Sequence, residues 1–282
     1  MLTRERSPLT RVVDASPSRR RDSDRSVDDH EAEHNSGRAS LRDHPEAVGH
    51  QNTPLAAQVL TECRRLLTTR SGRWLLSITQ LLGLLAAVGV VAGSPAADRT
   101  LAAVSTPVQS LMSVTAPFLG VLLTSKLHRA RHRNSLRPAL FAATALALVV
   151  AVSGVLLSVV AVAVAPSTAQ AGTWQHFGLI VTGSIVVQVI AQLVGTGLGL
   201  LLRSPVVACI ASIVLPLGLW LVLGSTDTLR PAQDWLTPFA GVARLTAGQL
   251  SALGWVQSLV VFLIWAVGLN TVGAARLKAR RS

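Results

Sequence analysis

One short segment of the sequence has the residue types of a metalloenzyme site. His30-Glu31-Ala32-Glu33-His34 fits the H-E-x-x-H pattern, in which two histidines one helical turn apart bind zinc and the glutamate acts as general base. That chemistry requires a rigid helix, a third ligand and a cleft that excludes water. Residues 1–54 around the motif contain only seven Leu, Ile, Val or Phe residues. We therefore interpret the motif as a chance match and expect no metal site.

Other catalytic patterns are absent from the sequence. It contains no G-x-x-x-x-G-K-[ST] phosphate loop and no G-x-S-x-G nucleophile motif. Its two cysteines, Cys63 and Cys209, are too few for a disulfide framework or a cysteine zinc site. We expect a chain that is not an enzyme and has no cofactor of its own. Any ATP hydrolysis must come from a partner.

The charge is divided unevenly along the chain. Residues 1–54 hold 9 Arg and 10 acidic residues, whereas the remainder holds 17 basic and 4 acidic residues. The low apolar content of residues 1–54 cannot offset the entropy of ordering, so they are predicted to form a disordered cytoplasmic tail. The basic remainder is explained by orientation in a membrane, which makes a nucleic-acid partner unnecessary.

Six long runs in residues 55–282 lack Asp, Glu, Lys and Arg. A hydrocarbon core of about 30 Å needs roughly 20 helical residues, so each run is long enough to span a membrane. The sequence therefore predicts an all-α integral membrane protein with six transmembrane helices. Their approximate bounds are 74–92, 104–123, 139–165, 178–202, 204–224 and 255–275. The second run is the weakest prediction, because its Ser, Gln and Pro residues indicate either a polar lining or a kinked, partly buried helix.

Loop charges orient these helices. With six spans, 14 basic residues fall on one side and three basic residues on the other, together with all three acidic residues that follow Glu62. Lys and Arg concentrate on cytoplasmic loops. We therefore expect both termini in the cytoplasm.

An amphipathic helix is predicted immediately before the first span. From Leu55, apolar residues recur every three to five positions, with polar residues between them. We expect this helix to lie in the inner membrane interface, although an ordinary juxtamembrane linker would also fit. Its charged residues are Glu62, Arg64, Arg65 and, at its end, Arg70.

Polar residues recur at helical spacing inside two spans. Ser105, Gln109 and Ser113 follow one face of the second span, and Gln188 and Gln192 follow one face of the fourth. Gly195 and Gly199 add a small-residue pair to the fourth span. Such residues either pack helices together through hydrogen bonds or line a substrate path. Both alternatives remain open, and Ser105, Gln109 and Ser113 are our candidates for the path.

The segment from Glu62 to Trp74 resembles the start of bacterial ABC-type-2 permeases, where an acid, a basic residue and a Thr/Ser-Arg pair precede the first span. The order of later parts is also similar. Trp235-Leu236-Thr237-Pro238-Phe239 resembles the outer helices that re-enter the membrane before the last span in that family. The resemblance covers roughly residues 55–280.

The resemblance implies a function and its partners. It implies the membrane-spanning subunit of an ABC transporter, an exporter in the plasma membrane of a bacterium. This subunit would dimerise with itself or with a paralogue and be driven by a separate ATPase subunit. The family places an ATPase-coupling helix between the second and third spans. Here that loop is basic throughout, which anchoring to the membrane explains equally well, and its residues include Lys126, His128, Arg129, Arg131, His132 and Arg133. The alternative function is a membrane scaffold or regulator without transport.

Overall fold

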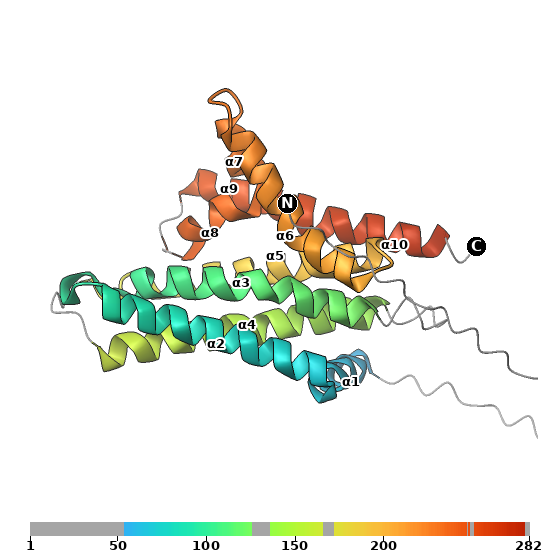
Figure 1. Cartoon of the computed structure of the whole chain (residues 1–282), viewed down its shortest axis with the longest axis horizontal. Helices are drawn as coiled ribbons and strands as arrows, with labels where there is room; N and C mark the ends of the chain where they lie inside the picture. Colours follow the sequence, from blue (N-terminus) through green and yellow to red (C-terminus); the bar gives the residue numbers. More distant parts are fainter. Residues whose placement is uncertain (1–53, 126–135, 166–171, 247, 249–250, 280–282) are drawn as a thin grey trace, which may run out of the picture. The chain divides into compact units, whose positions relative to one another are not determined.

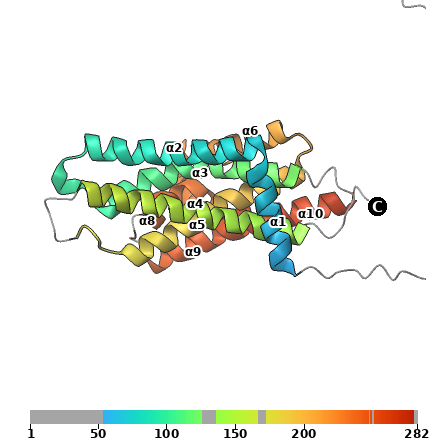
Figure 2. The ribbon, with the colours of Figure 1, turned by 90° about the horizontal axis from the view of Figure 1, so that it is seen from below.

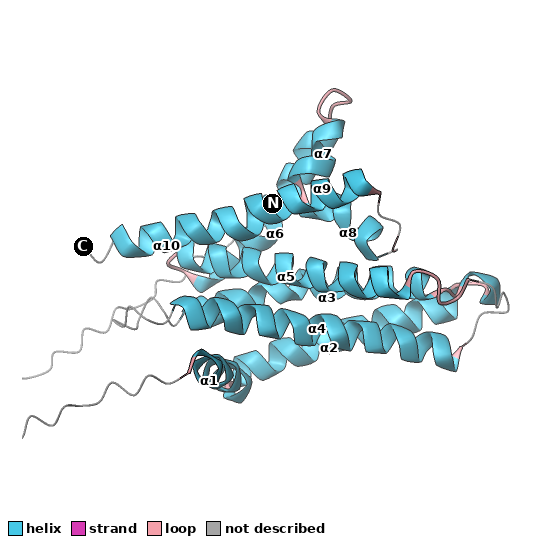
Figure 3. Cartoon of the chain, turned by 180° about the vertical axis from the view of Figure 1, so that it is seen from behind, coloured by secondary structure: helices cyan, strands magenta, loops and turns pink. Residues whose placement is uncertain are grey.

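The structure is a computed structural model, and it describes residues 54–125, 136–165, 172–246, 248 and 251–279. The described part of the chain consists of helices and short connections without strands (Figure 3). Six of its helices are long and apolar enough to cross a membrane. The predictions of an all-α fold and of six membrane-spanning helices are confirmed at this level.

The observed helices begin and end close to the predicted bounds. The membrane-length helices are α2 (Arg70–Gly93), α3 (Leu101–Ser125), α4 (Leu136–Val164), α5 (Phe177–Leu201), α6 (Pro205–Gly224) and a last helix made of α9 (Ala252–Val261), the π-helical segment η3 (Phe262–Gly268) and α10 (Leu269–Ala279). The shorter elements are α1 (Leu55–Thr68), η1 (Ala96–Asp98), α7 (Arg230–Leu236) and α8 (Pro238–Thr246).

The first span starts four residues earlier than the charge-free run predicted. Thr69 precedes α2 in an extended conformation, and its Oγ1 accepts a hydrogen bond from the Gly72 N–H at 3.2 Å. Arg70 and Arg73 therefore lie within the first turn of α2 rather than before it. A rule that ends a span at the first charge cannot recognise this cap.

Consecutive spans run in alternating directions, and α6 is inclined to its neighbours in Figure 1. The central helix is α5, which packs against α3, α4, α6, α8 and α10. On the other side of α3 and α4 lies α2 (Figure 2). Of the six membrane-length helices α3 is the most buried. The polar second run is thus an interior helix, which explains its low hydropathy.

Close backbone contact joins α3 to α5. Gly195 and Gly199 face α3, and a Cβ added at either position would overlap the Pro117 carbonyl or the Thr124 hydroxyl. Gly120 of α3 lies equally close to the backbone of α5: a Cβ added at Gly120 would lie 2.5 Å from the Gln192 carbonyl oxygen. Small residues allow two helices to approach to backbone contact, where dispersion forces hold them in lipid. The predicted Gly195–Gly199 pair therefore serves helix packing.

The two ends of the spans differ in charge. One end of the spans contains α1, the start of α2 and the end of α10. The described charged residues at this end are Arg64, Arg65, Arg70, Arg73, Arg137, Arg203, Arg276 and Lys278, with Glu62 as the acidic residue. In the described connections from the opposite ends, Asp98, Asp227 and Asp234 balance Arg99, Arg230 and Arg244. This asymmetry is the one that the loop count predicts.

Two predicted regions lie outside the described residues. The tail prediction covers residues 1–54, of which the structure describes Pro54, the residue before α1. The basic loop prediction, Lys126 to Arg133, lies between α3 and α4, in the part of the chain that the structure does not describe.

Candidate functional site

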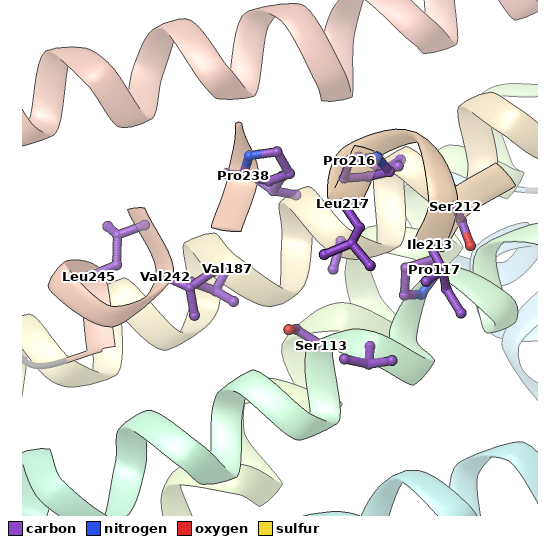
Figure 4. A pocket seen from close by; sticks show the side chains of 14 residues that line it. Ser113, Pro117, Val187, Ser212, Ile213, Pro216, Leu217, Pro238, Val242 and Leu245 are labelled. Carbon is purple, nitrogen blue, oxygen red and sulfur yellow. The ribbon is translucent and has the colours of Figure 1, made fainter. Parts of the chain in front are cut away.

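A cavity of about 280 Å³ lies between α3, α5, α6 and α8 (Figure 4). Its lining consists of Ser113, Val114, Pro117, Val187, Ile190, Ala191, Val194, Ser212, Ile213, Pro216, Leu217, Pro238, Val242 and Leu245. Ser113 is the midpoint of α3, and Val187 to Val194 span the midpoint of α5. The cavity is therefore at half the length of the spans, which corresponds to the middle of a bilayer.

The same local sequence supplies two walls of the cavity. Ser113 precedes Pro117 by four residues in α3, and Ser212 precedes Pro216 by four residues in α6. A proline inside a helix has no N–H to donate to the carbonyl four residues earlier. Each S-x-x-x-P segment thus leaves the carbonyl of its serine without the usual helical bond, beside a serine side chain that lines the cavity.

Both serine hydroxyls already donate to their own helices. Ser113 Oγ donates to the Ser110 carbonyl at 2.7 Å, and Ser212 Oγ donates to the Cys209 carbonyl at 2.8 Å. A hydroxyl that donates its proton can still accept a hydrogen bond. The two polar positions on the walls therefore offer hydrogen-bond acceptors in an otherwise apolar space.

No ionisable side chain lines this cavity in the described part of the chain. Transfer of an unpaired charge from water into such an apolar space is strongly unfavourable, whereas transfer of apolar surface is favourable. The arrangement therefore suits a neutral, mainly apolar molecule with a hydrogen-bond donor.

Helix α8 closes one side of the cavity and is fixed by polar contacts. Arg244 Nη2 lies 2.6 Å from Asp234 Oδ1 of α7, and Arg244 Nη1 donates to Gln257 Oε1 of α9 at 3.2 Å. Thr246 of α8 and Thr106 of α3 share a hydroxyl hydrogen bond of 3.1 Å. These contacts connect α8 to three other helices.

The helix before α8, α7, is also held by hydrogen bonds, at its middle and at its end. Gln233 Nε2 donates to the Trp220 carbonyl of α6 at 2.6 Å. Trp265 Nε1 donates to the Leu236 carbonyl at 2.7 Å, at the junction of α7 and α8. Trp265 belongs to the π-helical segment η3, and π-helical segments frequently occur at functional sites. The last span therefore positions the helix that closes the cavity.

The predicted path residues separate into two groups. Ser113 lines the cavity, whereas Ser105 and Gln109 are fully buried on α3. Gln109 Nε2 donates to the Ala151 carbonyl of α4 at 3.1 Å, and Gln188 Nε2 donates to Gln109 Oε1 at 2.9 Å. Gln109 and Gln188 thus hydrogen-bond across the interfaces of α3 with α4 and α5. The structure does not bring Ser105 and Gln109 to the cavity wall.

Gln192 of α5 bonds to backbone groups of α3 beside Pro117. Its amide orientation follows from its neighbours: the nitrogen donates to the Ala116 carbonyl and the oxygen accepts from the Gly120 N–H at 3.1 Å. These are the groups that an ordinary α-helix would pair with each other across Pro117. The Gln192 side chain therefore satisfies both backbone groups beside Pro117 and joins α5 to α3.

Two further polar residues connect spans. Asn270 Nδ2 donates to the Leu193 carbonyl at 2.8 Å, and Thr196 Oγ1 donates to Asn270 Oδ1 at 3.0 Å, which connects α10 to α5. Gln80 Nε2 donates to Ser153 Oγ at 2.7 Å, which connects α2 to α4. Both residues therefore pack neighbouring spans together through interhelical hydrogen bonds.

The amphipathic segment forms α1, which packs on α4. Leu66 is its buried residue, and Cys63 Sγ lies 3.7 Å from the Ala142 carbonyl. Burial, and secondarily the charge of Glu62, raise the pKa of the Cys63 thiol above its ordinary value. Glu62 lies 3.8 Å from the exposed Arg65, within α1.

The arginines of this segment lie on the surface. Arg64, Arg65 and Arg70 are exposed. At the turn into α2, a Cβ added at Gly72 would overlap the Leu66 carbonyl, so the close turn between the two helices requires glycine there. A helix therefore precedes the first span, as the sequence predicts, but it ends at Thr68, before Arg70, and its place in the membrane interface stays a prediction.

Sequence reasoning missed the cavity residues on α6 and α8. The signal that could have found them is the repeated S-x-x-x-P segment, since a second copy at mid-span is unusual for a helix that only packs. The contribution of Pro238, Val242 and Leu245 depends on how α8 folds back and has no such local signal.

Comparison with known proteins gives no relative from which to transfer a function. No family model matches the sequence, and no curated protein matches it.

Proposed function

We propose that this chain is the membrane-spanning permease subunit of an ABC transporter, and that it exports a neutral, mainly apolar molecule through the cavity between α3, α5, α6 and α8. The observation that carries the proposal is the position of that cavity: it is at mid-span, and it is closed by a short helix that folds back between the fifth and sixth spans. Sites of this kind, at membrane depth and beside irregular helices, are typical of transporters.

The energy source follows from what the sequence lacks. A transporter driven by protons usually places a titratable group within the membrane, and the predicted spans contain no Asp, Glu, Lys, Arg or His. The chain also has no phosphate loop, so ATP hydrolysis belongs to a separate ATPase subunit. We assign ATPase docking to the basic loop, Lys126 to Arg133, on the same side of the membrane as both termini.

Alternating access requires helices that can bend beside the substrate. Pro117 and Pro216 weaken α3 and α6 at the cavity wall, whereas the α3–α5 interface behind it is held by backbone contact. We expect α6 to move against α3, α5 and α8, with two permease subunits forming the complete path. The dimer partner is a second copy or a paralogue, in the plasma membrane of a bacterium.

Affinity purification of the full chain in mild detergent tests the energy source. We expect an ATP-binding partner bearing G-x-x-x-x-G-K-[ST] to copurify, and the reconstituted complex to hydrolyse ATP faster when a neutral apolar probe such as a fatty alcohol is present. Copurification of cytoplasmic proteins without any nucleotide-binding subunit would instead support the scaffold function.

A second experiment tests the docking loop. Replacing Arg129, Arg131 and Arg133 together with Ala should uncouple ATP hydrolysis from transport in proteoliposomes, because the ATPase loses its contact. The matched control replaces Arg276, Lys278 and Arg280, which carry the same charge at the C-terminus. Equal loss of coupling between ATP hydrolysis and transport in both triple variants would show that the coupling depends on net charge rather than on the loop.

A further inference from the structure

A second cavity, of about 400 Å³, lies between α4 and α10. Both helices pack on α5, and Leu193 of α5 contributes to its lining. The adjacent residue, Val194, lines the first cavity instead, so the two cavities are on neighbouring faces of α5, about 100° apart around the helix. We call this second cavity the α4–α10 groove.

The groove extends from the basic end of the spans toward the membrane interior. Its α4 wall runs from Arg137 to Thr144, and its second wall runs in the opposite direction from Ala274 of α10 to Ala266 of η3. Seven residues separate the ends of the first wall and eight those of the second, which corresponds to about 10 Å along a helix at about 1.5 Å per residue. The groove therefore reaches about one third of the way into a hydrocarbon core of about 30 Å.

Arg137 provides the donors at the mouth of the groove. The other polar side chains of the lining donate to backbone carbonyls: Thr144 to Leu140, Thr271 to Gly268, and the Asn270 amide to Leu193 and Ala266. The guanidinium of Arg137 is exposed in the first turn of α4. Phe141, more than half of whose surface is exposed, continues the wall below it.

We propose that the α4–α10 groove binds one anionic phospholipid, with its phosphate on Arg137 and an acyl chain along Phe141, Leu193 and Val267. Guanidinium and phosphate form charge-assisted, often bidentate hydrogen bonds. Basic pockets between transmembrane helices on the cytoplasmic side are recognised sites for anionic headgroups. The apolar walls exclude water along the chain, as burial of an acyl chain requires.

Charge also distinguishes a lipid from a second copy of this chain in the groove. The described charged residues at this end of the spans are basic except for Glu62. A second copy in the same membrane orientation would therefore bring arginine and lysine toward Arg137, which is unfavourable. An anionic lipid neutralises the same region.

Native mass spectrometry of the full chain tests this site. The protein is delipidated in detergent and titrated with phosphatidylglycerol, with phosphatidylcholine as the zwitterionic reference. We expect wild-type protein to bind one phosphatidylglycerol in preference to phosphatidylcholine, and Arg137→Gln to weaken that binding about fivefold. Arg276→Gln, which removes an exposed charge of α10 outside the groove, should leave it unchanged.

Filling the groove tests the site independently of charge. Ala274→Leu places a larger side chain in the groove and should also weaken phosphatidylglycerol binding, whereas Ala275→Leu changes the exposed neighbouring residue and should not. Equal weakening by Arg137→Gln and Arg276→Gln would overturn the site in favour of diffuse attraction. Displacement by inorganic phosphate alone, or a change in dimerisation without a change in lipid binding for Ala274→Leu, would also overturn it. None of these readouts depends on the proposed transport function.

Discussion

The two faces of α5 show different ways of packing a membrane helix. Toward α3 it makes backbone contact through Gly195 and Gly199 and hydrogen bonds through Gln188. Toward α6 it contacts branched apolar side chains and leaves a cavity of about 280 Å³, whereas α8 is in backbone contact with α5, since a Cβ added at Gly183 would overlap the Leu245 carbonyl. In lipid, where apolar surface gains little by association, backbone contact holds helices together and the looser contact permits them to separate. We therefore regard α2 to α5, together with α8, as the fixed part and α6 as the part that moves.

The largest effect should follow from an added methyl group at the fixed interface. Gly195→Ala directs a Cβ into the Pro117 carbonyl, which is backbone and cannot move aside cheaply. We expect a loss of about 3 kcal/mol in unfolding free energy, measured by denaturant titration in mixed micelles.

Gly218→Ala is the matched control in the other region. Its added Cβ meets no heavy atom within 4 Å, so the higher helix propensity of Ala should leave stability unchanged or raise it by about 0.5 kcal/mol. Similar losses for both variants would remove the distinction between the two faces.

A smaller effect should follow from loss of the buried glutamine pair. Gln188→Leu removes the donor to Gln109 Oε1 and leaves that oxygen buried without the bond. We expect a loss of about 1 kcal/mol for Gln188→Leu or for Gln109→Leu. The double variant should lose less than the sum, because the two changes remove one shared interaction. Strict additivity in the same denaturant titration would show that the pair does not contribute as a unit.

The sequence predicts the spans well because their physical cause is local. A run of about 20 residues without charge crosses a membrane whatever lies beside it, and the runs match α2 to α6 and the last helix within a few residues. The packing role of Gly195 and Gly199 could also be predicted from the sequence, since small residues at helical spacing have few other uses.

The site was harder to predict from the sequence, because its location depends on contacts between segments that are far apart in the chain. Ser105, Gln109 and Ser113 lie on one helical face by spacing, yet only Ser113 reaches the cavity. The difference arises because Gln109 forms hydrogen bonds with Gln188 of α5 and with the Ala151 carbonyl of α4. The sequence of α3 alone does not predict which residues of other helices lie next to it. The π-helical segment around Trp265 has no evident local signal either.

Filling the cavity should separate stability from function. Ala191→Phe places an aromatic ring in the apolar space between α5 and α6, so we expect a change of at most about 0.5 kcal/mol in stability. Substrate-stimulated ATP hydrolysis by the reconstituted complex should nevertheless be lost. Val214→Phe, at an exposed position of α6 outside the cavity, is the control and should retain it. Full activity of Ala191→Phe would assign the substrate path elsewhere.

The smallest effect concerns the two cysteines, of which Cys63 lies on the fixed side, where α1 packs on α4, and Cys209 lies on α6. Because burial and then Glu62 raise the pKa of the Cys63 thiol, it keeps its proton to higher pH than an ordinary thiol. The thiolate is the reactive form, so N-ethylmaleimide should modify Cys63 slowly at neutral pH, and the rate should rise in a more alkaline range than for the unfolded chain.

Two variants separate the causes of this slow reaction when labelling is followed by mass spectrometry of the intact protein across pH. Glu62→Gln removes the smaller cause and should accelerate the reaction slightly. Leu66→Ala removes the buried contact of α1 and should accelerate the reaction more. The thiol then becomes accessible to solvent, and it also loses the burial that raises its pKa. Rapid labelling of Cys63 in the wild-type chain at neutral pH would mean that α1 separates from α4 readily, and α1 would then belong with α6 among the parts that move.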